Sequence, residues 1–220
     1  MKPRRAQLIA LGAATVLLVA GCGDDDGGPE DAAQLPEGCA EVDAPEPNSA
    51  EVERSKDQLQ GPATAIVETS CGSFEIDLDT SRAPKTTSSF AGLAEQGFYD
   101  GTGFHRIQRG FVIQGGDPLG DGTGGPGYTV DEAPPEDLSY LRGTVAMAKN
   151  PVEPPGRSGS QFFIVTAPAD AGLPPDYALL GTIGEGFDVV ARIEQLGDPA
   201  GADGPPTAPV VIERIRVERG

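Results

Sequence analysis

Residues 104–117 read FHRIQRGFVIQGGD, and this pattern predicts the fold around them. Two runs of strand-forming residues flank a basic turn, and the pair Gly115-Gly116 closes the second run. We therefore expect a buried β-hairpin. Arg106 stands between apolar residues of the first strand, so its guanidinium should project into a walled site or form an ordinary ion pair.

The composition favours a single loop-rich β domain with extensions. The chain has 220 residues, of which 31 are glycine and 21 are proline, and aromatic residues make up 5%. These values favour a β protein with an aliphatic core over a helical bundle. The formal net charge of -18 argues against nucleic acid as a partner, because phosphates repel an acidic surface. It is compatible with an exported, highly soluble protein.

Residues 1–21 have the pattern of a bacterial lipoprotein signal peptide. A basic start precedes an apolar run, residues 8–20, that is too short to span a bilayer comfortably. The run ends in Val19-Ala20-Gly21-Cys22, which resembles the lipobox, where the cysteine is diacylated and becomes the new N-terminus. We predict export and a lipid anchor at Cys22 on the outer face of the cytoplasmic membrane. The alternative is an ordinary signal peptide with an incidental cysteine.

Residues 22–61 should form an acidic tether that is rich in proline and glycine. Such a segment cannot bury enough apolar surface to offset its ordering entropy, so we expect it to be solvated. The alternative for Asp24-Asp25-Asp26 is a more specific one, a metal site. We do not favour it, because runs of like charge are usually solvated, and we predict no metal site.

Two further cysteines remain, Cys39 in the tether and Cys71 in the first hairpin of the domain. An exported chain meets an oxidising compartment, and an even number of remaining cysteines suggests pairing. We predict a Cys39–Cys71 disulfide that joins the tether to the domain. The alternative is two free thiols.

Residues 62–220 carry the periodicities of one globular domain. Residues 63–69 predict a strand, and the alternation of Phe74, Ile76 and Leu78 with acidic residues predicts its hairpin partner. Helices are expected from Pro84 to about residue 97 and over residues 185–196. Further strands are expected over residues 143–149, 162–165, 178–183 and 210–217. The simplest architecture is a β-barrel capped by two helices.

Three motifs of this domain together resemble the cyclophilin family of peptidyl-prolyl cis-trans isomerases. They are FHRIQRGFVIQGGD, then GTGGPGY at 122–128, then SGSQFFIVTA at 158–167, and the likeness extends over roughly residues 63–218. The resemblance implies a closed eight-stranded antiparallel β-barrel capped by two α-helices. It also implies a groove on the outer face of the barrel that binds extended Xaa-Pro peptides and needs no cofactor.

The resemblance assigns a role to each matching position of the groove. The catalytic arginine corresponds to Arg106. The substrate-binding positions correspond to Phe111, Val112, Gln114, Ala148, Lys149, Gln161, Phe163, Leu173 and Tyr177. Three of these depart from the usual pattern, since Val112 stands where many members have a methionine, Lys149 replaces an asparagine, and Tyr177 stands where many members have a histidine.

Arginine suits this reaction because no covalent bond is made or broken. Amide resonance imposes a barrier of about 18–20 kcal/mol to rotation, and the prolyl nitrogen regains a lone pair when the amide twists. A guanidinium beside that nitrogen can donate a hydrogen bond that exists mainly in the transition state. His105, the single histidine, invites a catalytic assignment, but it should point away from Arg106 on the strand, so we interpret it as structural.

The sequence therefore predicts a monomeric, membrane-tethered prolyl isomerase that assists the folding of exported proteins. Its clients would be polypeptides that contain Xaa-Pro bonds. The main alternative is a non-catalytic module of the same fold that binds proline-containing segments as a chaperone or scaffold. A lipoprotein that binds carbohydrate or another ligand has only the lipobox and the acidity in its favour.

Overall fold

A computed structural model describes residues 35–48 and 52–220 of the chain. The predicted signal peptide, Cys22 and the first part of the predicted tether lie outside these residues. The strands are β1 (Ala63–Thr69), β2 (Gly72–Leu78), β3 (Gly103–Gln108), β4 (Val112–Asp117), β5 (Val130–Asp131), β6 (Thr144–Met147), β7 (Arg157–Ser158), β8 (Phe162–Val165), β9 (Leu179–Ile183) and β10 (Ile212–Arg219). The helices are α1 (Pro84–Glu95) and α2 (Phe187–Glu194).

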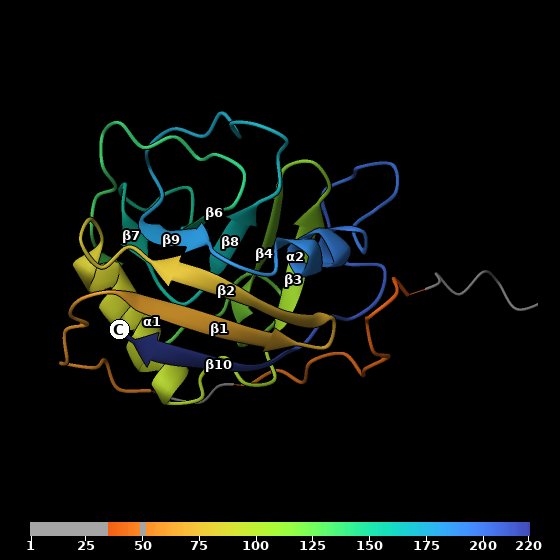
Figure 1. Ribbon diagram of the computed structural model, residues 1–220, viewed down its shortest axis with the longest axis horizontal. Coiled ribbons are helices and arrows are strands. Elements are labelled where there is room, and N and C mark those ends of the chain that lie inside the picture. Colours follow the sequence, from red (N-terminus) through yellow and green to blue (C-terminus); the bar gives the residue numbers. More distant parts are fainter. Residues whose placement is uncertain (1–34, 49–51) are drawn as a thin grey trace, which may run out of the picture. The chain divides into compact units, whose positions relative to one another are not determined.

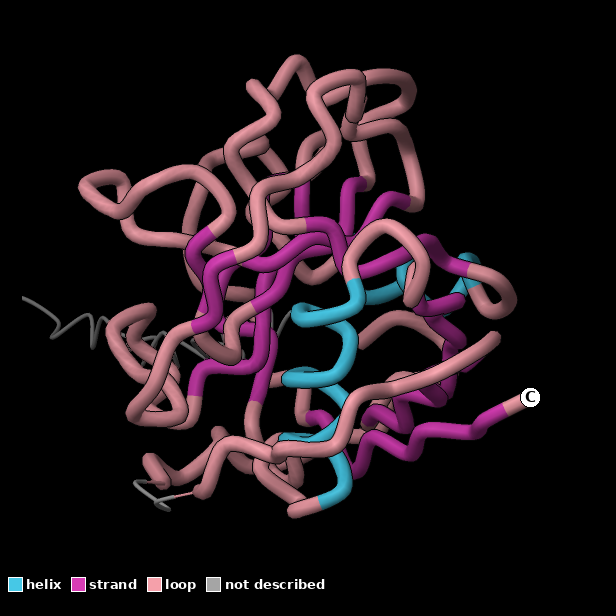
Figure 2. Tube along the Cα trace, turned by 90° about the vertical axis from the view of Figure 1, so that its left-hand side faces the viewer, coloured by secondary structure: helices cyan, strands magenta, loops and turns pink. Residues whose placement is uncertain are grey.

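Eight of the strands form one curled antiparallel sheet in the order β10-β1-β2-β9-β6-β8-β4-β3. Figures 1 and 2 show this curl. Strands β5 and β7 form a separate two-stranded ladder. The prediction of a closed barrel is wrong. Between the edge strands β3 and β10, the described residues form only isolated bridges such as Gly103–Val211, so the sheet is a half-barrel. The separation follows from the irregular loop that precedes β10 and lies against β3 in place of a continuous strand.

The two faces of the sheet bury two different apolar clusters. Strand β8 shows the division, because Phe162 and Ile164 belong to the main core while Phe163 and Val165 belong to a second cluster. Successive side chains of a strand point to opposite faces, so one short apolar strand serves both clusters. The inner cluster is the core of the half-barrel, and the outer cluster forms the floor of the site described below.

Two helices cover the ends of the sheet, as predicted. Pro84 occupies the first turn of α1, where its missing N–H costs no helical hydrogen bond, and Phe90 and Leu93 are fully buried. In α2, Val190 and Ile193 face the core. Figure 1 shows the two helices at opposite sides of the sheet. In the part of the chain that the structure describes, neither helix is long and apolar enough to cross a membrane.

The described part of the predicted tether, residues 35–48 and 52–61, packs along the domain, and we call it the N-terminal strap. Leu59 is only 5% exposed, and its N–H donates to the Ser88 hydroxyl on α1 at 2.9 Å. Asn48 N–H donates to the Pro118 carbonyl at 2.7 Å. The acidic side chains of the strap stay exposed while its apolar ones dock, so the expectation of a solvated segment does not hold for these residues.

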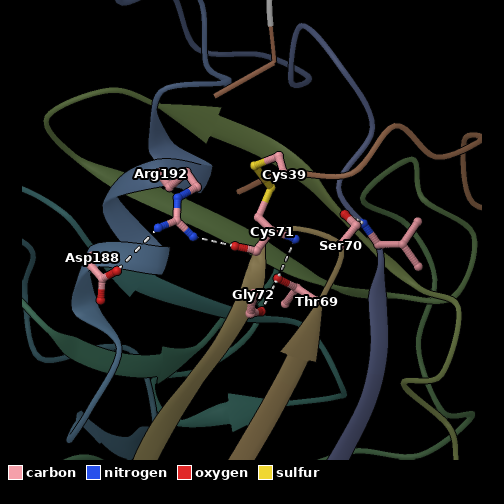
Figure 3. The surroundings of a disulfide bond; sticks show 8 residues. Cys39, Thr69, Ser70, Cys71, Gly72, Asp188 and Arg192 are labelled. Atoms are coloured by element: carbon pink, nitrogen blue, oxygen red, sulfur yellow. Dashed lines mark hydrogen bonds and ion pairs between the residues drawn. A yellow bond between two sulfur atoms is a disulfide. The ribbon is translucent and has the colours of Figure 1, made fainter. Parts of the chain in front are cut away.

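A disulfide between Cys39 and Cys71 fastens the strap to the domain, as the sequence predicts. Figure 3 shows the bridge at the β1–β2 turn, beside α2. Arg192 of α2 donates to the Cys71 carbonyl at 2.7 Å and also pairs with Asp188. The strap is therefore linked to the sheet by a covalent bond and to α2 through the backbone of Cys71.

Candidate active site

A row of side chains crosses the outer face of the sheet and defines the site. Arg106 of β3 lies opposite Gln114 of β4, which in turn lies opposite Phe163 of β8, and Phe163 lies opposite Ala146 of β6. Residues directly opposite in neighbouring strands project on the same side of the sheet. The pairing register therefore brings an arginine, a glutamine and an aromatic ring from three strands into contact range.

A β-bulge at His105 explains why Arg106 points outward. Phe104 pairs with Gly115 and Arg106 pairs with Gln114, so two steps along β3 correspond to one step along β4. Phe104 is buried in the inner core, and strict alternation would send Arg106 there as well. The extra residue reverses this alternation, which is a common use of bulges beside active sites.

Next to Arg106 lies a pocket of about 140 Å³ with three polar side chains in its lining, and we call it the apolar pocket because the other six lining residues are apolar or aromatic. Cavities of roughly this volume accommodate a benzene-sized ring. Its lining residues are Arg106, Phe111, Val112, Gln114, Ala148, Lys149, Phe163, Leu173 and Tyr177. Every substrate-binding position expected from the resemblance lies here except Gln161.

Tyr140 supports this pocket from below and was not singled out from the sequence. It is fully buried, and its hydroxyl donates to the Tyr177 carbonyl at 2.6 Å and accepts from the Tyr177 N–H at 3.0 Å. Its ring also packs edge-on against Tyr177, and Tyr177 packs edge-on against Phe163 at 5.3 Å. Burial raises the pKa of Tyr140 to about 12, so this phenol stays protonated and fixes the loop that carries Tyr177.

Gln161 reaches the site through a chain of side-chain hydrogen bonds. Arg106 Nη1 donates to Gln114 Oε1 at 3.0 Å, and Gln114 Nε2 donates to Gln161 Oε1 at 2.9 Å. Gln161 Nε2 then donates to the carbonyls of Gly122 and Gly124. The two glutamines thus connect Arg106 to the glycine-rich loop. Gln161 can reach the backbone carbonyls of this loop because its glycines have no side chains.

Two further N–H groups of Arg106 donate to an acidic residue that the sequence did not indicate. Nε and Nη2 donate to the two carboxylate oxygens of Asp203, at 2.8 and 2.9 Å. Asp203 is 97 residues further along the chain, in a Gly, Ala and Pro-rich loop without a recognisable motif. No local sequence signal could have identified this pair.

A larger cavity of about 870 Å³ adjoins the apolar pocket and shares Gln114, Ala148 and Lys149 with it. Lys149 Nζ lies 5.7 Å from the centre of the Tyr177 ring and donates to the Glu153 carbonyl at 3.1 Å. The lysine therefore stands at the boundary between the two cavities.

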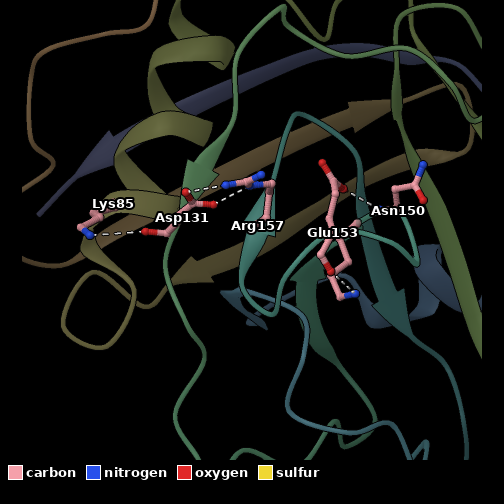
Figure 4. Close-up of polar contacts among 6 residues, drawn as sticks. Lys85, Asp131, Asn150, Glu153 and Arg157 are labelled. Carbon is pink, nitrogen blue, oxygen red and sulfur yellow. Dashed lines mark hydrogen bonds and ion pairs between the residues drawn. The ribbon is translucent and has the colours of Figure 1, made fainter.

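Two polar contacts order the loops beside the larger cavity, as Figure 4 shows. Glu153 accepts from the Asn150 N–H at 2.7 Å, which closes the proline-rich loop that carries one wall. Arg157 of β7 forms a bidentate ion pair with Asp131 of β5, at 2.7 and 2.9 Å. These contacts hold the cavity walls without contributing to the apolar pocket.

His105 lines neither cavity. Neither of its ring nitrogens has a hydrogen-bond partner in the described structure, and burial lowers its pKa despite the opposing influence of Asp117. A half-buried imidazole that lines neither cavity is not placed to touch a peptide in the pocket.

The described residues contain no cluster of three or more His, Cys, Asp or Glu side chains that could hold a metal ion.

What the site offers is a ring-sized apolar pocket, an arginine on its wall and two glutamines beside it. This combination can bind an apolar ring and donate hydrogen bonds to the polar atoms attached to it.

Comparison with known proteins identifies the family. The sequence model described as "Cyclophilin type peptidyl-prolyl cis-trans isomerase/CLD" matches residues 64–217. The chain belongs to the cyclophilin family. Membership agrees with the order of the three motifs and with the outer-face pocket.

Curated cyclophilin relatives align with about 70% of the chain. "Probable peptidyl-prolyl cis-trans isomerase B" of Mycobacterium leprae is 40% identical over 176 residues, which are 71% of this chain and 58% of that protein. "Peptidyl-prolyl cis-trans isomerase-like 1" of Neurospora crassa is 38% identical over 157 residues, which are 70% of this chain and 93% of that protein. The chain thus spans little more than half of the first relative and nearly all of the second.

Solved cyclophilin structures share the fold. A cyclophilin-type peptidyl-prolyl cis-trans isomerase of Cryptosporidium parvum superposes with a TM-score of 0.65 at 30% identity, and the match covers 72% of this chain and 99% of that one. The same protein, crystallised in the presence of the dipeptide Ala-Pro, gives a TM-score of 0.64. The half-barrel and its two helices are therefore the cyclophilin fold.

Proposed function

We propose that this chain catalyses the cis–trans isomerisation of Xaa-Pro peptide bonds. The observation that carries the proposal is the position of Arg106 on the wall of a ring-sized apolar pocket, beside Gln114. The relatives named above bear the name of peptidyl-prolyl cis-trans isomerases, and one of them was crystallised in the presence of the dipeptide Ala-Pro. A proline ring in the pocket would bring its nitrogen close to the guanidinium.

The chemistry needs only groups that the site contains. The pocket lined by Phe111, Phe163 and Leu173 holds the proline ring and excludes water, which strengthens a hydrogen bond made at its edge. Arg106 donates to the prolyl nitrogen when the amide twists and that nitrogen regains its lone pair. Gln114 and Gln161 hold the peptide backbone on one side while the other side rotates.

A prolyl tetrapeptide isomerisation assay tests this function. Replacing Arg106→Ala should lower kcat/KM by roughly 100-fold, which is typical for the loss of one transition-state donor. The matched control is Arg214→Ala, which removes an exposed arginine of β10 and should leave the rate unchanged.

The same assay separates the enzyme from a binding module. If the wild-type protein bound a prolyl peptide without accelerating its isomerisation, the non-catalytic alternative would replace the proposal. Equal rates for wild type and Arg106→Ala would instead refute the role of Arg106 alone.

We further propose that the protein is exported, lipid-anchored at Cys22, and acts as a monomer on Xaa-Pro bonds of exported proteins to assist their folding. The basic and apolar segments before Cys22 and the lipobox-like Val19-Ala20-Gly21-Cys22 support the anchor. Metabolic labelling with a radioactive fatty acid should mark the wild-type protein and not Cys22→Ser. Labelling of both proteins would contradict the assignment.

A further inference from the structure

The Arg106 guanidinium is held from outside the sheet by Asp203, in the loop between α2 and β10. Nε donates to Oδ1 at 2.8 Å and Nη2 donates to Oδ2 at 2.9 Å, so the two planar groups meet through parallel bonds. Such bidentate pairs fix the orientation of the guanidinium plane as well as its position. Asp203 itself lines neither cavity.

Backbone hydrogen bonds place Asp203 opposite Arg106. The Ile107 N–H, next to Arg106, donates to the carbonyl of Gly204, next to Asp203, at 2.8 Å, and these two residues form an antiparallel bridge. Further along the same loop, Thr207 is hydrogen-bonded through its N–H and its hydroxyl to the backbone that follows α2. The loop is therefore tied to the domain at Gly204 and at Thr207, directly after Asp203, which limits the freedom of the carboxylate.

The pair leaves part of the guanidinium available to a substrate. A guanidinium has five N–H donors. Two go to Asp203 and one, on Nη1, goes to Gln114 at 3.0 Å. One donor on Nη1 and one on Nη2 remain in the described structure. Asp203 and Gln114 together determine where these two donors point.

The exposure of the pair indicates that its main effect is not on stability. The side chains of Arg106 and Asp203 are 33% and 46% exposed. Exposed ion pairs contribute little to folding because solvent screens them and ordering the side chains costs entropy. An arginine that must meet a transient lone pair depends much more on orientation, since small misplacements of a catalytic group reduce rates strongly.

We propose that Asp203 is a positioning residue for prolyl isomerisation: it holds the Arg106 guanidinium in the orientation from which its free N–H groups reach the prolyl nitrogen. This inference rests on the proposed function. Asp203 acts through Arg106 and does not touch the peptide. Its loss should therefore reduce turnover while leaving the apolar pocket, and hence peptide binding, intact.

The test compares Asp203→Asn with wild type in the full chain. The amide keeps the shape of the side chain but can accept from only one of the two N–H groups. With a prolyl tetrapeptide, kcat should fall by about 3- to 10-fold while KM and the affinity for an Ala-Pro dipeptide stay within a factor of about two. Asp203→Glu should recover part of the rate because both carboxylate oxygens are restored.

Two controls separate positioning from loss of charge or of structure. Glu213→Gln removes one exposed carboxylate from β10 and should leave kcat unchanged. In an Arg106→Lys background, which has no planar fork to orient, Asp203→Asn should cause less than a twofold further loss, because residues that act as a unit are not additive. The Arg106 Nε–H resonance, followed by NMR, should shift in Asp203→Asn and not in Glu213→Gln.

Each contrary result has a distinct meaning. A wild-type protein without isomerase activity would overturn the proposed function. An active wild type with an Asp203→Asn variant of equal kcat would overturn the role of Asp203 and leave the function standing. A rise in KM with unchanged kcat, or a full additional loss in the Arg106→Lys background, would show that Asp203 acts on the peptide or the loop and not through Arg106.

Discussion

Arg106 differs from an ordinary surface arginine in the way its donors are divided. A carboxylate takes one edge of the guanidinium, a glutamine takes one N–H of Nη1, and the apolar pocket adjoins the rest. His105, its neighbour, has the opposite character, because its ring nitrogens are buried and have no partner among the described residues. His105 is the extra residue of the bulge that turns Arg106 outward.

This burial predicts a pH effect on stability. Burial lowers the pKa of His105 below its ordinary value of 6.5, although Asp117 and Asp121 oppose the shift and Arg106 adds to it. Below pH 6.5 the histidine of the unfolded chain is protonated while that of the folded chain is not. The free energy of unfolding therefore decreases as the pH is lowered from 6.5 to the folded pKa of His105. One such group contributes at most about 1.4 kcal/mol per pH unit.

Thermal unfolding at pH 7.5 and 5.5 measures this effect. The drop in melting temperature between the two pH values should be smaller for His105→Gln than for wild type. Both pH values lie above the ordinary pKa values of carboxylates. The other titrating groups are the same in the two proteins, so they contribute equally to both drops. An equal drop in the two proteins would contradict the assignment of the effect to His105.

At the scale of elements, the sheet depends on close approaches of backbone that only glycine permits. Gly181 of β9 pairs with Leu78 of β2 on one side and with Val145 of β6 on the other. A Cβ atom at Gly181 would overlap the Asp77 carbonyl. The apolar run at residues 178–183 predicts a strand, but the need for glycine in its centre follows only from the neighbouring strand.

Gly181→Ala should therefore destabilise the domain by about 1–3 kcal/mol, as overpacking usually does. For a domain of this size the melting temperature should fall by roughly 3–10 °C. Gly125→Ala is the matched control, because nothing lies within 4 Å of the position its Cβ would take, and its stability should not change measurably. Equal melting temperatures for Gly181→Ala and wild type would show that β2 and β9 can separate without cost.

For the whole molecule, the N-terminal strap extends the domain beyond the residues that match the family. Residues 64–217 match the family model, whereas Leu35, Cys39 and Val52 of the strap pack against the core outside that range. The disulfide fastens this addition at the β1–β2 turn and lines neither cavity. The strap should therefore support stability and leave the chemistry unaffected.

Removing the disulfide tests this division. The bridge joins residues 32 positions apart, for which the chain-entropy account gives about 3–4 kcal/mol of stabilisation. Cys39→Ser should lower the melting temperature by roughly 10 °C and leave kcat/KM unchanged. A reducing agent should destabilise wild type and have no effect on Cys39→Ser. A loss of activity in a still folded variant would show that the strap influences the site.

The sequence by itself predicted the eight strands of the main sheet and both helices, although not the short strands β5 and β7, and it predicted the pairing of Cys39 with Cys71. Through motif resemblance it also supplied the set of residues around the pocket. Local periodicity and the turn residues predict the strands and helices. Contiguous motifs such as FHRIQRGFVIQGGD contain many of the residues of the site. Even there, the roles of the pocket residues remain predictions, although all but Gln161 line the same pocket as Arg106.

Only the tertiary structure decided the open edge between β3 and β10, the docking of the strap, the support from Tyr140 and the pair between Arg106 and Asp203. Each of these features is a contact, or a missing contact, between segments that are far apart in the chain. Strand register, a β-bulge or the path of a loop decides whether such segments come together. Local periodicity carries no information about such meetings, because the free energy that stabilises them arises from packing and hydrogen bonds between the segments.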